Sequence, residues 1–196
     1  MSADAVELRV LGCLIEKQRT TPDAYPLSLN ALRLACNQAT NRDPVVDYDE
    51  HAIRDALQRL SAKGWVRLAS GPSSRAVKYR QLFDEALGLT AEDISLLAVL
   101  MLRGAQTVGE LKSRSERLHR FGSLPEVDEA LHALASRELV VRLERRPGQK
   151  EERWEHQLRQ EPSTVPTAAP PDSLEERVRL LEEQVAELRE QLDRAV

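Results

Sequence analysis

Residues 47–68, DYDEHAIRDALQRLSAKGWVRL, change from a helical to a strand-like hydrophobic period within a few positions. The helical part places four apolar residues on one face: Ile53, Ala56, Leu57 and Leu60. Asp47 and Glu50 resemble a capping box that starts this helix, and Gly64 is suited to end it. Residues 65–68 then alternate with a period of two, which is typical of a strand. Such a switch predicts the third helix and the first hairpin strand of a winged helix.

The same layout recurs 74 positions later in the chain. The corresponding apolar residues are Val127, Ala130, Leu131, Leu134, Leu139 and Val140. Each copy follows apolar segments of helical period and precedes two short strand-like runs joined by a polar turn. We therefore predict a mainly α fold with small β-hairpins, of class α+β. It would consist of two tandem winged-helix domains, residues 1–88 and 89–160.

Polar residues and a proline mark the starts of other predicted helices. Ser28 is suited to cap the second helix of the first domain. Thr90, with Asp93 three residues later, is suited to cap the first helix of the second domain. Pro125 falls in the first turn of that domain's third helix.

The C-terminal part has a different composition. Residues 161–173 contain prolines among small and polar residues, which predicts an extended linker. Residues 174–196 carry a heptad pattern of apolar residues: Leu174, Val178, Leu181, Val185, Leu188 and Leu192. Valine and leucine in these positions favour a parallel two-stranded coiled coil, through which the protein would form a homodimer. The alternatives are antiparallel pairing and a helix that folds back onto one of the domains.

The net charge of −4 resides in this C-terminal part. Residues 1–88 carry +1 and residues 89–161 carry −1, whereas residues 162–196 carry −4. Both domains are therefore nearly neutral, which neither excludes nucleic acid nor supports it as a strongly basic domain would.

Several classes of protein are disfavoured by what the sequence lacks. No stretch approaches the ~20 apolar residues of a membrane span, and the N-terminus lacks the features of a signal peptide. Cys13 and Cys36 lie in apolar helical patterns and predict buried, reduced thiols, so we expect a cytoplasmic protein without membrane contact. Motifs for zinc, phosphate loops and nucleophilic catalysis are missing, so we expect no metal, no cofactor and no enzymatic activity.

The outward face of the predicted third helix is where a winged helix reads DNA. This face presents His51 and Gln58, with Arg54 and Arg59 on its flanks. Arginine and glutamine can bond base edges and phosphates, whereas Asp55 on the same face would repel phosphate. With basic residues before the helix and in the hairpin, the candidate DNA-binding set is His51, Arg54, Gln58, Arg59, Arg42, Arg75 and Lys78. The alternative is an ordinary solvated helix face.

The equivalent helix of the second domain has an acidic outward face, formed by Glu126, Asp128, Glu129 and His132. Its carboxylates oppose DNA, so we interpret the second domain as a unit that contacts a protein partner or forms the dimer. Residues 37–43, NQATNRD, form a loop of short amides and hydroxyls that typically cap helices and satisfy turns. The functional alternative for this loop is a contact with a ligand or a phosphate.

Three stretches resemble motifs of the YceH family: residues 21–32 (TPDAYPLSLNAL), 35–45 (ACNQATNRDPV) and 146–154 (RPGQKEERW). The resemblance covers roughly residues 5–160. It implies two winged-helix domains in one chain. It implies little about activity, because the function of that family is essentially unknown.

These observations favour a protein that binds duplex DNA, as a transcriptional regulator would, through the third helix and hairpin of the first domain. The alternative is a non-enzymatic protein–protein adaptor, which the near-neutral charge favours. A third alternative is a regulator in which the loop at residues 37–43 senses a small ligand.

Deletion of residues 174–196 should lower the oligomeric state, because it removes every apolar heptad position. Multi-angle light scattering of the full and shortened chains at matched concentration measures this change. An unaltered number of subunits would contradict the coiled-coil interpretation.

Overall fold

The computed structural model describes residues 2–69, 77–145 and 151–159. By their contacts, residues Met1–Gln160 form one compact unit. The predicted linker at 161–173, the heptad residues of 174–196 and Arg75 in the first hairpin lie outside the described residues. The interpretations attached to them stay predictions.

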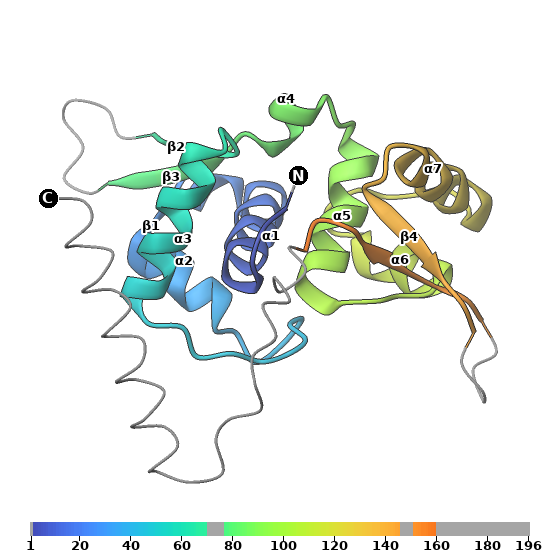
Figure 1. Ribbon diagram of the computed structural model, residues 1–196, viewed down its shortest axis with the longest axis horizontal. Helices are drawn as coiled ribbons and strands as arrows, with labels where there is room; N and C mark the ends of the chain where they lie inside the picture. Colours follow the sequence, from blue (N-terminus) through green and yellow to red (C-terminus); the bar gives the residue numbers. More distant parts are fainter. Residues whose placement is uncertain (1, 70–76, 146–150, 160–196) are drawn as a thin grey trace, which may run out of the picture. The chain divides into compact units, whose positions relative to one another are not determined.

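The first half of the described chain contains three long helices and a small sheet (Figure 1). Its elements are α1 (Ala5–Thr20), the 3-10 helix η1 (Pro22–Ala24), β1 (Leu27–Ser28), α2 (Leu29–Cys36), α3 (Glu50–Ala62), β2 (Val66–Leu68) and β3 (Lys78–Gln81). The strands are antiparallel in the order β1-β3-β2, with Leu27 opposite Tyr79 and Arg67 opposite Arg80. β1 therefore ties the connection between α1 and α2 to the hairpin.

The second half repeats this order after a short helix, α4 (Phe83–Leu87). Its elements are α5 (Ala91–Arg103), α6 (Val108–Ser115), α7 (Leu124–Ser136), β4 (Val140–Leu143) and β5 (Arg153–His156). β4 pairs antiparallel with β5, and Gln106 pairs with Trp154 in an isolated bridge. This bridge lies between α5 and α6 in sequence, where the first half has β1. The mixture of helices and small antiparallel sheets confirms the predicted α+β class.

The predicted repeat of apolar residues is confirmed in the core. The buried residues of α3 are Ile53, Ala56, Leu57 and Leu60, and those of α7 are Val127, Leu131 and Leu134, with Ala130 half-buried. The structure also confirms four predicted residues at helix starts: Ser28, Thr90, Asp93 and Pro125. Hydrophobic period and capping chemistry therefore predict most of the helices.

The start of α3 differs from the prediction. Asp49, and not Asp47, is the N-cap, and its Oδ1 accepts a hydrogen bond from the backbone N–H of Ala52 at 2.8 Å. Asp47 instead accepts a hydrogen bond from the side-chain amide of Asn37 at 3.3 Å. The sequence offers two aspartates for one capping position, and a contact with the end of α2 engages the first of them.

The short helix α4 is absent from the sequence-based expectations, because its five residues are too few for a periodic pattern. Residues outside α4 hold this helix in place. Gln81 Oε1, at the end of β3, accepts a hydrogen bond from the Phe83 N–H at 2.6 Å. The Phe83 ring meets the edge of Trp65, with ring centroids 4.9 Å apart.

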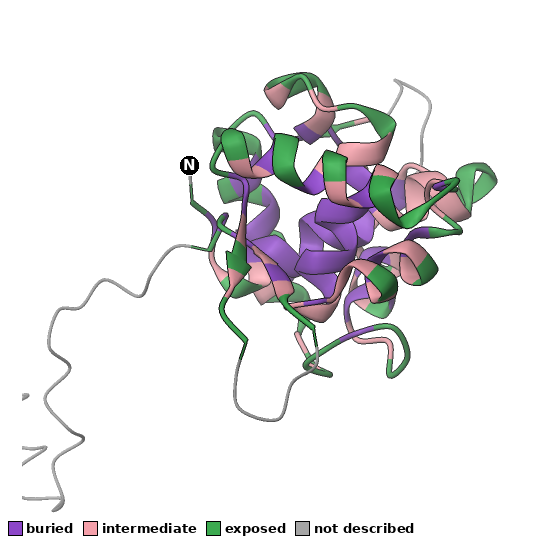
Figure 2. Cartoon of the chain, turned by 90° about the vertical axis from the view of Figure 1, so that its right-hand side faces the viewer, coloured by how far each residue is buried: buried purple, intermediate pink, exposed green. Residues whose placement is uncertain are grey.

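α1 and α5 pack against each other (Figure 1). Figure 2 shows that the buried residues gather on helices in the interior of the described unit. Residues 7–15 of α1 and 94–102 of α5 are buried without interruption. A helix with no solvent-facing side belongs to the interior, so each of these helices needs the other half to cover it. Gly12 permits their approach, because a Cβ there would lie 3.0 Å from the Leu102 side chain. One core thus runs through both halves, and the division at residue 88 stays a prediction.

This interior contains the two cysteines. Cys13 of α1 and Cys36 of α2 are buried free thiols, as the sequence predicts. Within the described ranges, no helix combines the length and the hydrophobicity that a membrane span needs.

Gly12→Val should lower the free energy of unfolding by about 1–3 kcal/mol, because the added methyl groups would push against Leu102 and Met101. Gly109→Ala in α6 is the control, since a Cβ there meets only Thr107 Oγ1 at 3.9 Å. The control should be neutral or stabilising by up to about 1 kcal/mol through helix propensity. Urea unfolding followed by circular dichroism measures both. A harmless Gly12→Val would contradict the close α1–α5 contact.

Candidate nucleic-acid interface

α3 packs one face against α1 and α2 and leaves the opposite face in solvent. His51, Arg54 and Gln58 share this exposed face. Their spacing of three and four residues places them one turn apart along the helix. Asp55 is half-buried beside them, and its Oδ1 lies 3.4 Å from Nδ1 of His51. The structure therefore brings together the three candidate side chains that the helical period predicts to face outward.

Arg59 lies at the edge of this face and takes part in an ion-pair network. Its Nη2 lies 2.7 Å from Asp4 Oδ2, and its Nε lies 3.9 Å from Glu7 Oε1. Lys63 Nζ lies 2.6 Å from the same Glu7 oxygen. Asp4 and Glu7 form the capping box of α1, so these cations anchor the end of α3 to the start of α1. Arg54, by contrast, forms no ion pair with any described residue.

The surface position predicted for Arg42 is corrected by the structure, because its side chain is 0% exposed. Its Nη1 and Nη2 donate to the two carboxylate oxygens of Glu16 at 3.1 and 2.7 Å. Its Nε donates to the Ala35 carbonyl at 3.1 Å, and Nη1 also donates to the Asn41 carbonyl at 2.8 Å. These bonds fasten the loop at residues 37–43 to α1. Arg42 therefore has a structural role and is not exposed to solvent.

The Arg42 guanidinium also sets the charge state of Glu16. Burial by itself would raise the pKa of the Glu16 carboxyl. The hydrogen bonds and positive charges of Arg42 and, to a smaller extent, Lys17 together outweigh burial and hold that pKa below its usual value. Glu16 is therefore a carboxylate at neutral pH, and the pair is ionic.

The first hairpin adds cations beside α3, since β2 follows α3 and contacts it. Arg67 of β2 is exposed, whereas Lys78 and Arg80 of β3 are half-buried. Arg80 forms an ion pair with Glu85 of α4. Basic side chains therefore lie on the described part of the hairpin, whose strand β2 contacts α3.

The outer face of α7 differs from that of α3. Asp128 and Glu129 place carboxylates on it, and Asp128 Oδ2 lies 3.6 Å from His132 Nε2. The His132 ring meets the edge of Trp154, with centroids 5.2 Å apart. Because these carboxylates would repel phosphates, the equivalent helices of the two halves present chemically different surfaces.

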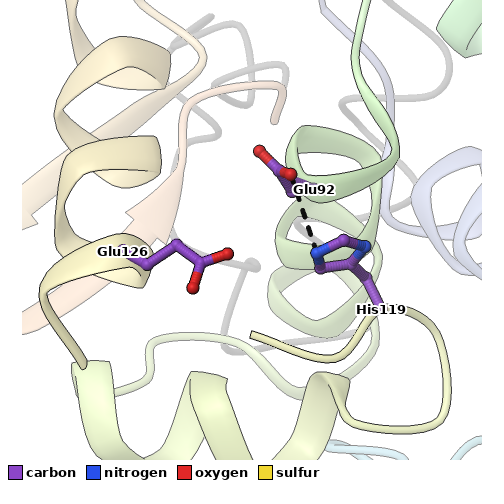
Figure 3. A group of neighbouring side chains, drawn as sticks. All are labelled: Glu92, His119 and Glu126. Carbon is purple, nitrogen blue, oxygen red and sulfur yellow. Dashed lines mark ion pairs between the residues drawn. The ribbon is translucent and has the colours of Figure 1, made fainter. Parts of the chain in front are cut away.

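One group of described side chains has the composition of a metal site (Figure 3). Glu92, His119 and Glu126 come from the start of α5, the α6–α7 connection and the start of α7, and their ligand atoms lie within 4.8 Å of one another. His119 Nε2 lies 3.7 Å from Glu92 Oε1, and Glu126 accepts a hydrogen bond from the Gly122 N–H at 2.7 Å. Carboxylate and imidazole suit several divalent cations, so this group could hold one. Its residues form no short motif, which is why spacing predicts no metal site.

Arg42→Met should lower the free energy of unfolding by about 3–5 kcal/mol, because it removes the two hydrogen bonds of Arg42 from the partly buried Glu16 carboxylate and leaves it only the more exposed Lys17 as a cation. Arg54→Met is the control and should change stability by less than about 0.5 kcal/mol, because Arg54 is exposed. Urea unfolding measures both.

The loss in Arg42→Met should depend on pH. The lowered pKa of Glu16 stabilises the folded protein above the pKa of the unfolded chain, and that contribution disappears as pH falls through the folded pKa. The gap between wild type and Arg42→Met should therefore narrow in acid. Equal stability of the two substituted proteins at neutral pH would contradict a buried ion pair.

Comparison with known proteins places this architecture in a family. A family model described as "Protein of unknown function, DUF480" matches residues 3–149. The UPF0502 protein Ent638_1581 of Enterobacter sp. (strain 638) is 45% identical over 202 residues, which cover 96% of this chain and 94% of the relative. The UPF0502 proteins YceH of Salmonella typhimurium and Salmonella enteritidis are 44% identical over 201 residues, with the same coverage. The resemblance seen in the sequence motifs is confirmed, and this chain belongs to the YceH (UPF0502) family.

Proposed function

We propose that this protein binds duplex DNA and that both of its halves are winged-helix modules. The order of elements supports the second part, because a winged helix has three helices, a hairpin, and a short strand between the first two helices that pairs with the hairpin. In the first half this strand is β1, in the sheet order β1-β3-β2. In the second half the bridge between Gln106 and Trp154 takes its place.

The observation that carries the DNA proposal is the exposed polar face of α3 beside a basic hairpin. The 13 residues of α3 give a helix about 20 Å long, of a kind that fits a major groove about 12 Å wide. Gln58 can bond the edge of adenine, and Arg54 can bond guanine or a phosphate. Arg67 on the hairpin is suited to contact the sugar–phosphate backbone next to that groove.

The second half has a different task in this proposal. The carboxylates of α7 would repel the DNA phosphates, so we expect only α3 of each chain to contact the bases. A homodimer formed through residues 174–196 would bring two α3 helices to one duplex, as in other dimeric readers. The protein acts by binding and not by catalysis.

A groove on the second half favours a second candidate function, that of a protein–protein adaptor. Its volume is about 700 Å³, and its lining includes Leu124, Pro125 and Trp154 between charged side chains. Leu124 is 51% exposed. Exposed apolar side chains within a polar rim are typical of protein contact surfaces.

The full chain should bind random-sequence duplex DNA at low salt, measured by fluorescence anisotropy. The logarithm of affinity should fall with the logarithm of salt concentration with a slope of about −3 to −5, since the described residues on this side include a few exposed or half-buried cations. They are Arg54, Arg59, Arg67, Lys78 and Arg80. No binding at low salt would overturn the DNA proposal and favour the adaptor.

The same measurement on Arg54→Ala tests whether α3 is the helix that contacts DNA. This change should weaken binding by about 1–3 kcal/mol if Arg54 bonds a base, or reduce the salt slope by about one if it bonds a phosphate. Arg120→Ala is the matched control, because it removes the same charge from a side chain of the second half that is 85% exposed. Equal losses in the two variants would move the interface away from α3.

A further inference from the structure

A cavity of about 370 Å³ lies where the two halves of the compact unit meet. Its walls come from four segments: the C-terminal ends of α1, α5 and α6, and the loop between α2 and α3. That loop is the amide- and hydroxyl-rich stretch at residues 37–43, whose chemistry the DNA proposal leaves unused.

The lining of this cavity has an excess of positive charge. Its basic residues are Lys17, Arg103, Arg114 and Arg117. Its acidic residues are Glu16 and Glu116, and Glu16 is already held by Arg42 at 2.7 Å. Neither Arg103 nor Arg117 forms an ion pair with any described residue. Within the described ranges, two of these four cations, Arg103 and Arg117, therefore have no carboxylate as an ion-pair partner, whereas Lys17 pairs with Glu16 and Arg114 with Glu110.

The environment of Arg103 reflects this excess. Burial lowers the pKa of its guanidinium, and the positive charges of Arg114 and Arg42 lower it further, against the opposing effect of Glu16 and Glu110. Like charges near one another destabilise the charged form of each. An anion placed between Arg103 and Arg114 would remove that repulsion.

The loop also contributes hydrogen-bond donors that are already oriented. Gln38 Oε1 accepts from Arg42 Nη2 at 3.2 Å, and Asn41 Oδ1 accepts from Arg103 Nη2. Because each side-chain carbonyl is engaged by a guanidinium, the amide NH₂ group of each residue is left to donate. The backbone N–H of Asp43 donates to the Leu102 carbonyl at 2.9 Å, which fixes the loop against α5. The wall formed by the loop at residues 37–43 is therefore preorganised.

We propose that this cavity binds a small phosphorylated molecule. Guanidinium groups pair with phosphate oxygens through two parallel hydrogen bonds, and neither Arg103 nor Arg117 forms an ion pair with a described carboxylate. A volume of about 370 Å³ is at the lower end of the ~300–1,000 Å³ of ligand pockets and exceeds what one phosphate group fills. Both halves line the cavity, so the ligand stabilises the junction of α1 with α5 when it binds.

Titration calorimetry of the full chain with sodium pyrophosphate at constant ionic strength tests this proposal. The expected result is saturable binding with a dissociation constant below about 1 mM, together with a melting temperature that rises with pyrophosphate concentration. Arg103→Gln and Arg117→Gln should each weaken binding about tenfold or more. Arg117→Gln is the safer variant, because Arg117 is exposed and makes no hydrogen bond or ion pair within the described residues, so its loss should leave the fold intact.

Arg137→Gln is the matched control, because it removes the same charge from an exposed residue that does not line this cavity, and it should leave pyrophosphate binding unchanged. An equal loss in this control, or no saturation by about 10 mM, would overturn the site. Displacement of pyrophosphate by a short duplex would assign the cavity to the DNA backbone and overturn a small-molecule ligand. Pyrophosphate binding in a protein that ignores DNA would support the cavity and count against the DNA proposal alone.

Discussion

The contact between α1 and α5 is the constraint on which the rest of the structure depends. Residues 7–15 of α1 and 94–102 of α5 are buried around the whole circumference of each helix, so neither half can bury its own first helix without the other. Gly12 allows the two backbones to approach, and Leu102 fills the space above it. Once α1 and α5 are used as core, α3 and α7 become outer helices, and the ends of α1, α5 and α6 enclose the basic cavity. The exposed faces of α3 and α7 and the position of the cavity thus follow from the contact between α1 and α5.

The two halves share a core pattern and differ in surface chemistry. On α3 the outward positions hold Arg54 and Gln58, and on α7 the positions 74 residues later hold Asp128 and His132. Burial constrains the inward stripe to apolar residues in both copies, whereas the solvated face is free to diverge. The duplicated architecture is therefore compatible with two tasks, and the charge difference supports DNA contact by the first copy only. The second copy instead exposes Leu124 over an open groove, which suits a protein partner.

The helices could be predicted because they depend on residues that are close in sequence. The predictions for Arg42 and for the N-cap of α3 were wrong because they depend on contacts between segments that are distant in sequence. The apolar stripes of α3 and α7 depend on residues three and four apart, so periodicity alone identifies them. Arg42 looked like a surface cation because it lies in a polar loop, and only the fold brings Glu16, 26 residues away, to its guanidinium. The choice of Asp49 over Asp47 as the cap of α3 depends on a contact with α2 in the same way. The basic cavity draws on four separate segments, so no motif could reveal it, although the unusual composition of residues 37–43 marked one wall.

Backbone NMR of the full chain, titrated with a short random-sequence duplex at low salt, tests most directly whether α3 alone meets DNA. The backbone amide resonances of residues 50–59 and of the neighbouring strand β2 should change their chemical shifts. The reason is that the exposed face of α3 would enter the major groove and Arg67 would lie at its border. The chemical shifts of the α7 amides should not change, since the carboxylates of this helix repel phosphate. Shifts concentrated on α7, or binding that leaves α3 undisturbed, would contradict the assignment of the first half as the reader.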